Sequence, residues 1–199
     1  EIESVLKNIK DRHPGLADIE YNVISKGEEA LALIREIHRL DNPTWSFDRI
    51  DQAAQDTLNN SEAFVSDNEV YVIADNIRGK DKESATNRLV QVAEFHETIG
   101  HFGLRKYLGQ NYDKYIRNFY RTNEKDIKKW AKDPDGGASY IQERFEKVFG
   151  RNIVDGATDK EINTLFTSFI PKDLKFTLGE EYIARNFTEA GVRDPNLIR

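Results

Sequence analysis

Two histidines with an acid between them are the residues of this chain best suited to chemistry. His96 and His101 enclose the stretch H-E-T-I-G-H, in which Glu97 directly follows the first histidine. Zinc takes imidazole and carboxylate ligands in proteins, and a catalytic zinc keeps one further position for water. Bound zinc makes that water acidic enough to attack near neutral pH, and an adjacent glutamate can take its proton and later return it to the leaving amine. The residue types therefore predict His96 and His101 as zinc ligands and Glu97 as the general base.

The spacing of the two histidines differs from that of the common zinc motif and requires a distorted helix if both are to bind one ion. The common zinc-peptidase motif is H-E-x-x-H, in which the ligands stand four residues apart on one helix face. Here they stand five apart, which on an ideal α-helix separates the side chains by about 140° rather than about 40°. One inserted residue, a π-bulge, restores the geometry, and such bulges recur at functional sites. Gly100 lies within the interval and tolerates distortion best, so we expect a π-type distortion there.

Composition narrows the possible sites further. The 199-residue chain contains no Cys, which excludes disulfides, thiolate zinc sites and Cys nucleophiles, so that any metal ligand must be His, Asp or Glu. It also contains no Met, even at position 1, which predicts a piece of a larger protein.

Charge and hydropathy bear on partners and location. The net charge of −6 argues against a nucleic-acid partner. We expect no membrane span, because no window approaches 18 consecutive apolar residues. The first residues lack the basic and apolar regions of a signal peptide. The localisation is therefore unknown from the sequence, and a cytoplasmic or a virion-associated protein is compatible with it.

The motif supports a resemblance. H-E-x-x-G-H resembles the motif of the dipeptidyl peptidase III family of zincins, and H-E-x-x-G-H-x-G-L-R is also similar to zincin-like domains of large phage and mobile-element polyproteins. The family's third ligand is a glutamate in a downstream helix motif. Residues 180–185, E-E-Y-I-A-R, are similar to it in the paired acids and the alanine but differ at Ile183 and Arg185. The resemblance implies Glu181 as the third zinc ligand and Glu180 as an acceptor that orients a ligand histidine.

Several alternatives stay open at this point. Acids at the start of a helix also stabilise its dipole, so Glu180 and Glu181 need no metal to explain them. Other carboxylates compete for the role of third ligand, namely Glu143, Glu146 and Glu161 on predicted helices after the motif, and Glu94 before it. A peptidase also needs a donor to the transition state, and the candidates are Tyr182, Arg185 and Tyr140.

The elements that must position these residues follow from periodicity. Alternating β-prone residues predict a strand over 19–24 and a hairpin over 63–74. A helical period covers 82–108, and the remainder reads as helices over 111–120, 124–132, 138–149, 158–169 and 178–190. Breaks are predicted at 133–137 and 171–173. The basic run over 125–129 is expected to be a solvated helix face. We therefore predict a helix-dominant α+β fold of zincin type, with a small β-hairpin region before a central motif helix.

The predicted organisation is one zincin-like domain over 1–199. Residues 1–80 form its α/β part, 81–109 the motif helix, and 110–199 a helical part that carries the third ligand. The predicted function is zinc-dependent hydrolysis of a peptide or protein substrate, with one hairpin strand pairing with the substrate backbone. One alternative is a catalytically silent zincin-like module that serves a structural or binding role beside other domains of its parent protein. Another is a helical interaction domain with coincidental histidines.

Overall fold

The computed structural model describes residues 2–16 and 18–193 and has a helix-dominant α+β fold, as predicted. Contacts divide the chain into two compact units. Unit 1 comprises residues 1–104 and 187–199, and unit 2 comprises residues 105–186. Among the described residues, no helix combines the length and the apolar character that crossing a bilayer requires.

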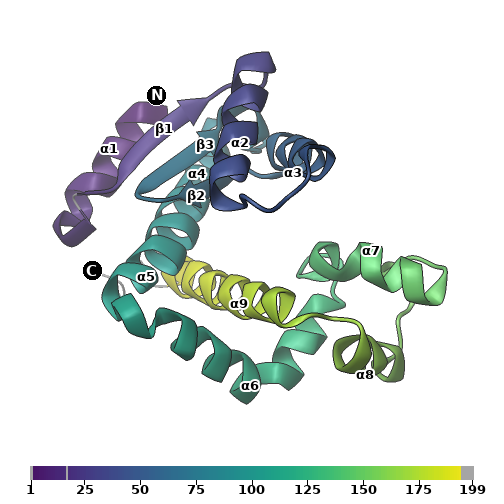
Figure 1. The fold of residues 1–199 in the computed structure, drawn as a ribbon. Coiled ribbons are helices and arrows are strands. Elements are labelled where there is room, and N and C mark those ends of the chain that lie inside the picture. Colours follow the sequence, from purple (N-terminus) through teal and green to yellow (C-terminus); the bar gives the residue numbers. More distant parts are fainter. Residues whose placement is uncertain (1, 17, 194–199) are drawn as a thin grey trace. The chain divides into compact units, whose positions relative to one another are not determined.

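A three-stranded sheet forms the centre of unit 1 (Figure 1). Its strands are β1 (Glu20–Ile24), β2 (Ala63–Ser66) and β3 (Glu69–Ile73). β3 lies in the middle, parallel to β1 and antiparallel to β2, so the predicted strand and hairpin are both present. Because β3 is paired on both sides, β2 is the strand of the hairpin that lies at a sheet edge.

Side chains of the sheet alternate between two helical layers, because successive residues of a strand point to opposite faces. Val70 and Val72 pack with α1 (Ile2–Arg12), α4 (Lys82–Val90) and the motif helix. Ile73 packs on the other face against α2 (Glu28–Asp41) and α3 (Phe47–Asn60). The sheet is thus covered on both faces, and the motif helix belongs to one of the covering layers.

The motif helix is continuous but changes its type along its length. α4 begins at a capping box between Asp81 and Ser84 and is followed without a break by a π-helix over Gln91–Gly103 and by α5 (Leu104–Leu108). The predicted π-type distortion is therefore present, and it extends over 13 residues rather than one turn. It contains both histidines of the motif.

Unit 2 is helical and has its own core. Its helices are α6 (Tyr112–Ala131), α7 (Ala138–Phe149), α8 (Asp159–Ser168) and most of α9 (Lys172–Arg193). Fully buried residues from all four helices, among them Ile127, Phe145, Phe166 and Leu178, form one cluster. The predicted break near 121–123 is a kink within α6, where Asn123 leaves helical geometry and donates from its side chain to the Phe119 carbonyl.

Candidate metal centre

The π-helix brings the two motif histidines together. A π-helix closes its hydrogen bonds between residues i and i+5, so side chains five apart stack on one face. The Nε2 atoms of His96 and His101 face each other at 3.4 Å, and the two rings meet at an angle of 77°. His101 is buried and His96 is half-buried. The histidines stand five residues apart rather than four, and the helix is a π-helix rather than an α-helix. The π-helix therefore offsets the longer spacing and keeps the two rings on one face.

The separation of the two nitrogens fits a shared metal ion. Zinc–nitrogen bonds of about 2.0–2.1 Å at a tetrahedral angle place two ligand nitrogens about 3.3–3.4 Å apart. The observed Nε2–Nε2 distance between His96 and His101 is 3.4 Å. At this distance one ring can donate an N–H to the other, or both Nε2 lone pairs can bind one cation, depending on the tautomers. The pair thus has the spacing and the donor chemistry of two ligands of one ion.

The outer nitrogen of His96 has a partner of its own. The hydroxyl of Thr188, on the last turns of α9, lies 3.4 Å from His96 Nδ1. When Nδ1 carries the proton and donates it to this hydroxyl, Nε2 keeps the lone pair that a metal requires. Such contacts fix the tautomer and the orientation of ligand histidines. Thr188 was not among the residues predicted from the sequence, although it makes this contact with His96.

Glu94 anchors the first turn of the π-helix. This carboxylate is 3% exposed and accepts from Arg12 Nε at 3.0 Å and from His13 Nε2 at 2.7 Å. Burial alone would raise the pKa of Glu94, but the hydrogen bonds from His13 and Arg12 outweigh it and hold the pKa below its usual value. The sequence suggested Glu94 only as a weak ligand candidate, and its carboxylate instead binds the end of α1 to the motif helix.

A second anchor lies one turn further along. Thr98 is fully buried, and its hydroxyl donates to the Ala93 carbonyl at 2.6 Å. Tyr21 of β1 therefore donates its hydroxyl hydrogen to Thr98 Oγ1, at 2.7 Å. Burial raises the pKa of Tyr21 to about 12, although the bond to Thr98 opposes the shift, so the phenol stays protonated. The π-helix is therefore bonded to the end of α1 through Glu94, two residues before His96, and to the sheet through Thr98, two residues after it.

Glu97 follows His96 on the same helix and is 6% exposed. A carboxylate so placed is costly unless it has polar partners. Its role as general base stays a prediction, beside its burial next to a candidate ligand in a largely apolar helix.

Unit 2 holds the paired acids of α9 by separate contacts. Tyr140 of α7 donates its hydroxyl hydrogen to Glu181 Oε2 at 2.9 Å. Glu180 accepts from Arg105 Nη2 at 2.9 Å and from the hydroxyl of Tyr112. Burial raises the pKa of Tyr112, and the adjacent carboxylate of Glu180 raises it further. The predicted orienting role of Glu180 toward a histidine stays a prediction, beside the two contacts that it makes here.

Glu181 completes a possible ligand set. One ligand atom from each of His96, His101 and Glu181 lies within 4.8 Å of the other two, so this group could hold a metal ion. Among the residues that the structure describes, no other cluster of three such side chains has this property. Glu181 and Thr188 stand seven residues apart on α9, which is about two turns, so the helix presents both on one face.

The other predicted residues have different surroundings. The Tyr182 ring packs against Trp130 and Phe119, with centroid distances of 5.6 and 6.4 Å, and Arg185 donates to the Asp135 carbonyl at 3.0 Å. Of the competing carboxylates, Glu161 accepts from Arg151 and closes the capping box of α8, whereas Glu146 accepts from Gln142. Glu143 is exposed on α7.

The fold and the site define a helix-dominant α+β protein with a histidine pair on a π-helical motif. Comparison with known proteins adds no relative, because no protein-family model, no curated protein and no solved structure matches the chain. The likeness to zincins therefore rests on the two motifs, and the case for a function rests on the geometry of the site.

Proposed function

We propose that this chain binds one zinc ion through His96, His101 and Glu181 and hydrolyses peptide bonds. The observation that carries the proposal is the 3.4 Å separation of the two histidine Nε2 atoms on a π-helix. This distance matches two ligands of a tetrahedral ion. A carboxylate oxygen of Glu181 within 4.8 Å supplies the third ligand.

Zinc, when bound, would supply a water acidic enough to attack a peptide carbonyl near neutral pH. The residues of the chain would handle the protons and the substrate. Glu97 would take the proton of the attacking water and later return it to the leaving amine. Glu97 directly follows the ligand His96 and is only 6% exposed, so bulk water has little access to this carboxylate.

The substrate is proposed to be an extended peptide that pairs with β2. Of the two hairpin strands, β2 has the edge position, whereas β3 is paired on both sides and buried over residues 70–73. An edge strand offers unpaired backbone groups to an incoming chain. β2 also contacts the π-helix, so a peptide along it would run past the motif.

Metal content and turnover test the proposal separately. The purified chain, loaded with zinc and then dialysed, should retain about one equivalent by elemental analysis, and the variant His96→Ala should retain far less. Glu97→Gln should keep the zinc and lose hydrolysis of a fluorogenic peptide library. A chain that retains no zinc would refute the metal site. A chain that retains zinc without cleaving any peptide would instead favour a catalytically silent module.

A further inference from the structure

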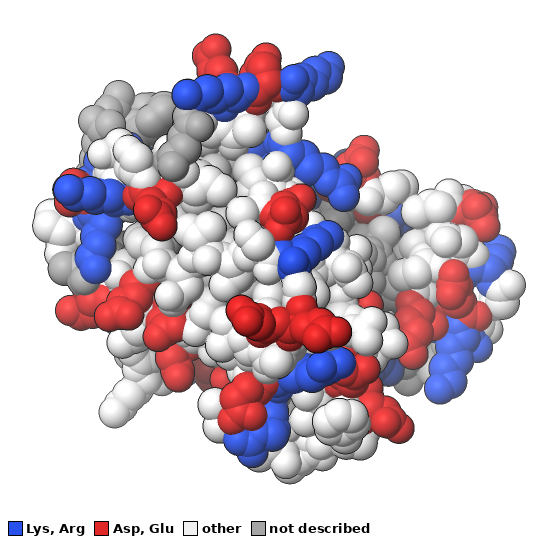
Figure 2. All heavy atoms as spheres, turned by 90° about the horizontal axis from the view of Figure 1, so that it is seen from above, with Lys and Arg blue, Asp and Glu red and all other residues white. Residues whose placement is uncertain are grey.

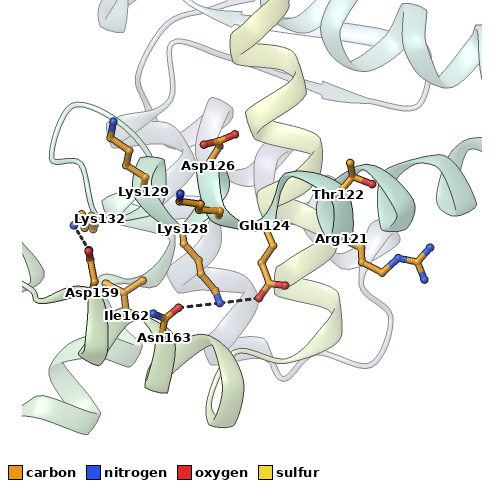
Figure 3. Close-up of a pocket in the computed structure, with 11 residues that line it drawn as sticks. Arg121, Thr122, Glu124, Asp126, Lys128, Lys129, Lys132, Asp159, Ile162 and Asn163 are labelled. Atoms are coloured by element: carbon orange, nitrogen blue, oxygen red, sulfur yellow. Dashed lines mark hydrogen bonds and ion pairs between the residues drawn. The ribbon is translucent and has the colours of Figure 1, made fainter.

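A hollow in unit 2 is lined largely by charged side chains (Figure 3). It has a volume of about 630 Å³ and lies between the second part of α6 and the start of α8. Five of its eleven lining residues are basic and three are acidic. The lining therefore carries a net charge of +2, opposite in sign to the −6 of the whole chain.

Two of the basic side chains are neutralised within the hollow. Lys128 forms an ion pair with Glu124 at 2.8 Å and also donates to Asn163, while Lys132 pairs with Asp159 at 2.5 Å (Figure 3). The other charged lining residues are Asp126 and three basic residues, which together carry the net charge of +2.

The other three basic side chains are Arg121, Lys125 and Lys129, all exposed. Within the part of the chain that the structure describes, none of the three forms an ion pair with a carboxylate; Arg121 donates to the Asn118 side chain at 3.1 Å. Lys125 and Lys129 stand four residues apart after the kink at Asn123, so they lie about 6 Å apart along this part of α6. Arg121 precedes the kink, and Figure 3 shows its side chain directed away from Lys129. The pair of Lys125 and Lys129 is hereafter the basic stripe.

We propose that the basic stripe binds an acidic peptide segment in an extended conformation. Side chains on one face of an extended peptide repeat every two residues, a distance of about 6.6–6.8 Å. Carboxylates at alternate positions of such a peptide therefore match the spacing of the stripe. The acids between the cations, such as Asp126, can accept from backbone N–H groups of the same peptide.

A nucleic acid fits these observations less well. Proteins that bind single strands offer aromatic side chains on which bases stack, and the hollow has no aromatic lining residue. Duplex binding draws on wide basic surfaces. The lining of the hollow instead mixes five basic with three acidic residues, and basic and acidic side chains are also interspersed on the separate face drawn in Figure 2. The short stripe thus suits a short anionic segment.

Fluorescence anisotropy with a labelled peptide that alternates Glu and Ser tests the proposal. The wild-type chain should bind this peptide at least tenfold more tightly than the corresponding Gln–Ser peptide. The double variant Lys125→Glu/Lys129→Glu should weaken binding about tenfold or more, since exposed ion pairs contribute about 0.2–1 kcal/mol each and the reversal adds repulsion. Binding should also weaken between low and high salt.

The matched control carries the same change of net charge elsewhere in unit 2. Lys114 and Lys147 are exposed on α6 and α7, outside the hollow, so Lys114→Glu/Lys147→Glu should stay within about threefold of wild type. Circular dichroism and thermal melting establish that both double variants are folded. Equal affinities of the two double variants would overturn the proposal. So would tighter binding of a single-stranded oligonucleotide than of the acidic peptide.

Discussion

Replacing Tyr140 by Phe removes a single hydroxyl from the candidate metal centre. That hydroxyl donates to Glu181 Oε2 at 2.9 Å, and Tyr140 is 39% exposed. A hydrogen bond to a charged acceptor contributes about 1.5–3 kcal/mol, and partial access of water places this one at the lower end. A loss of about 1.4 kcal/mol corresponds to a tenfold change in affinity. We therefore expect Tyr140→Phe to raise the Kd for zinc about tenfold.

Competition against a chromophoric zinc chelator measures this change. Tyr115→Phe is the matched control, because Tyr115 of α6 is 42% exposed and its ring stacks on Phe119; its zinc affinity should equal that of wild type. If Tyr140→Phe binds zinc as tightly as wild type does, the hydroxyl does not orient the ligand carboxylate and the reasoning fails. A wild-type chain that binds no zinc would refute the metal site instead, so the two failures are distinguishable.

Two further predictions concern stability. Glu94→Gln should lower the free energy of unfolding by about 2 kcal/mol at pH 7, because a buried charge-assisted network is lost. The pKa of Glu94 lies below its ordinary 4.5, since its basic partners outweigh the effect of burial. The carboxylate therefore stabilises the fold above pH 4.5, and this contribution is lost as the pH falls through the folded-state pKa. Urea unfolding should show the gap between wild type and variant closing in acid; a constant gap would contradict the assignment. Gly79→Ala should cost about 1–3 kcal/mol, because a Cβ there would lie 2.2 Å from the backbone nitrogen of Ala85. Gly15→Ala is the control, because no atom lies within 4 Å of its added Cβ, and it should melt at the temperature of wild type. Equal melting temperatures of the two variants would show that the chain around Gly79 shifts to accommodate the Cβ at little cost.

Much of the secondary structure was predictable, because it follows from local patterns. Alternation predicted a strand over 19–24 and a hairpin over 63–74, and the observed strands begin and end within a residue of these bounds, since period two is a property of neighbouring residues. The break near Asn123 followed from the sequence, although the structure makes it a kink within one helix. α9 is longer than expected at its N-terminus: it begins at Lys172, right after Pro171, whereas we predicted a break at 171–173 and a helix only from Leu178.

The anchors of the motif helix were not predictable in this way. His13 looks like a surface residue beside a proline, yet its ring bonds Glu94, 81 residues away in the chain. Tyr21 reads as an ordinary strand residue, yet it reaches Thr98 across 77 residues. No periodicity links such pairs, because their contact depends on how α1 and β1 pack against the π-helix.

The sequence by itself determined that any metal site must use histidine and carboxylate, and that two histidines five residues apart can bind one ion only on a distorted helix. Both conclusions follow from side-chain chemistry and helix geometry within a few residues. Only the tertiary structure singles out Glu181 among the several acids that the sequence offers, because Glu181, His96 and His101 form a group that could hold a metal ion. That choice depends on long-range packing, which brings together residues that local propensity leaves independent.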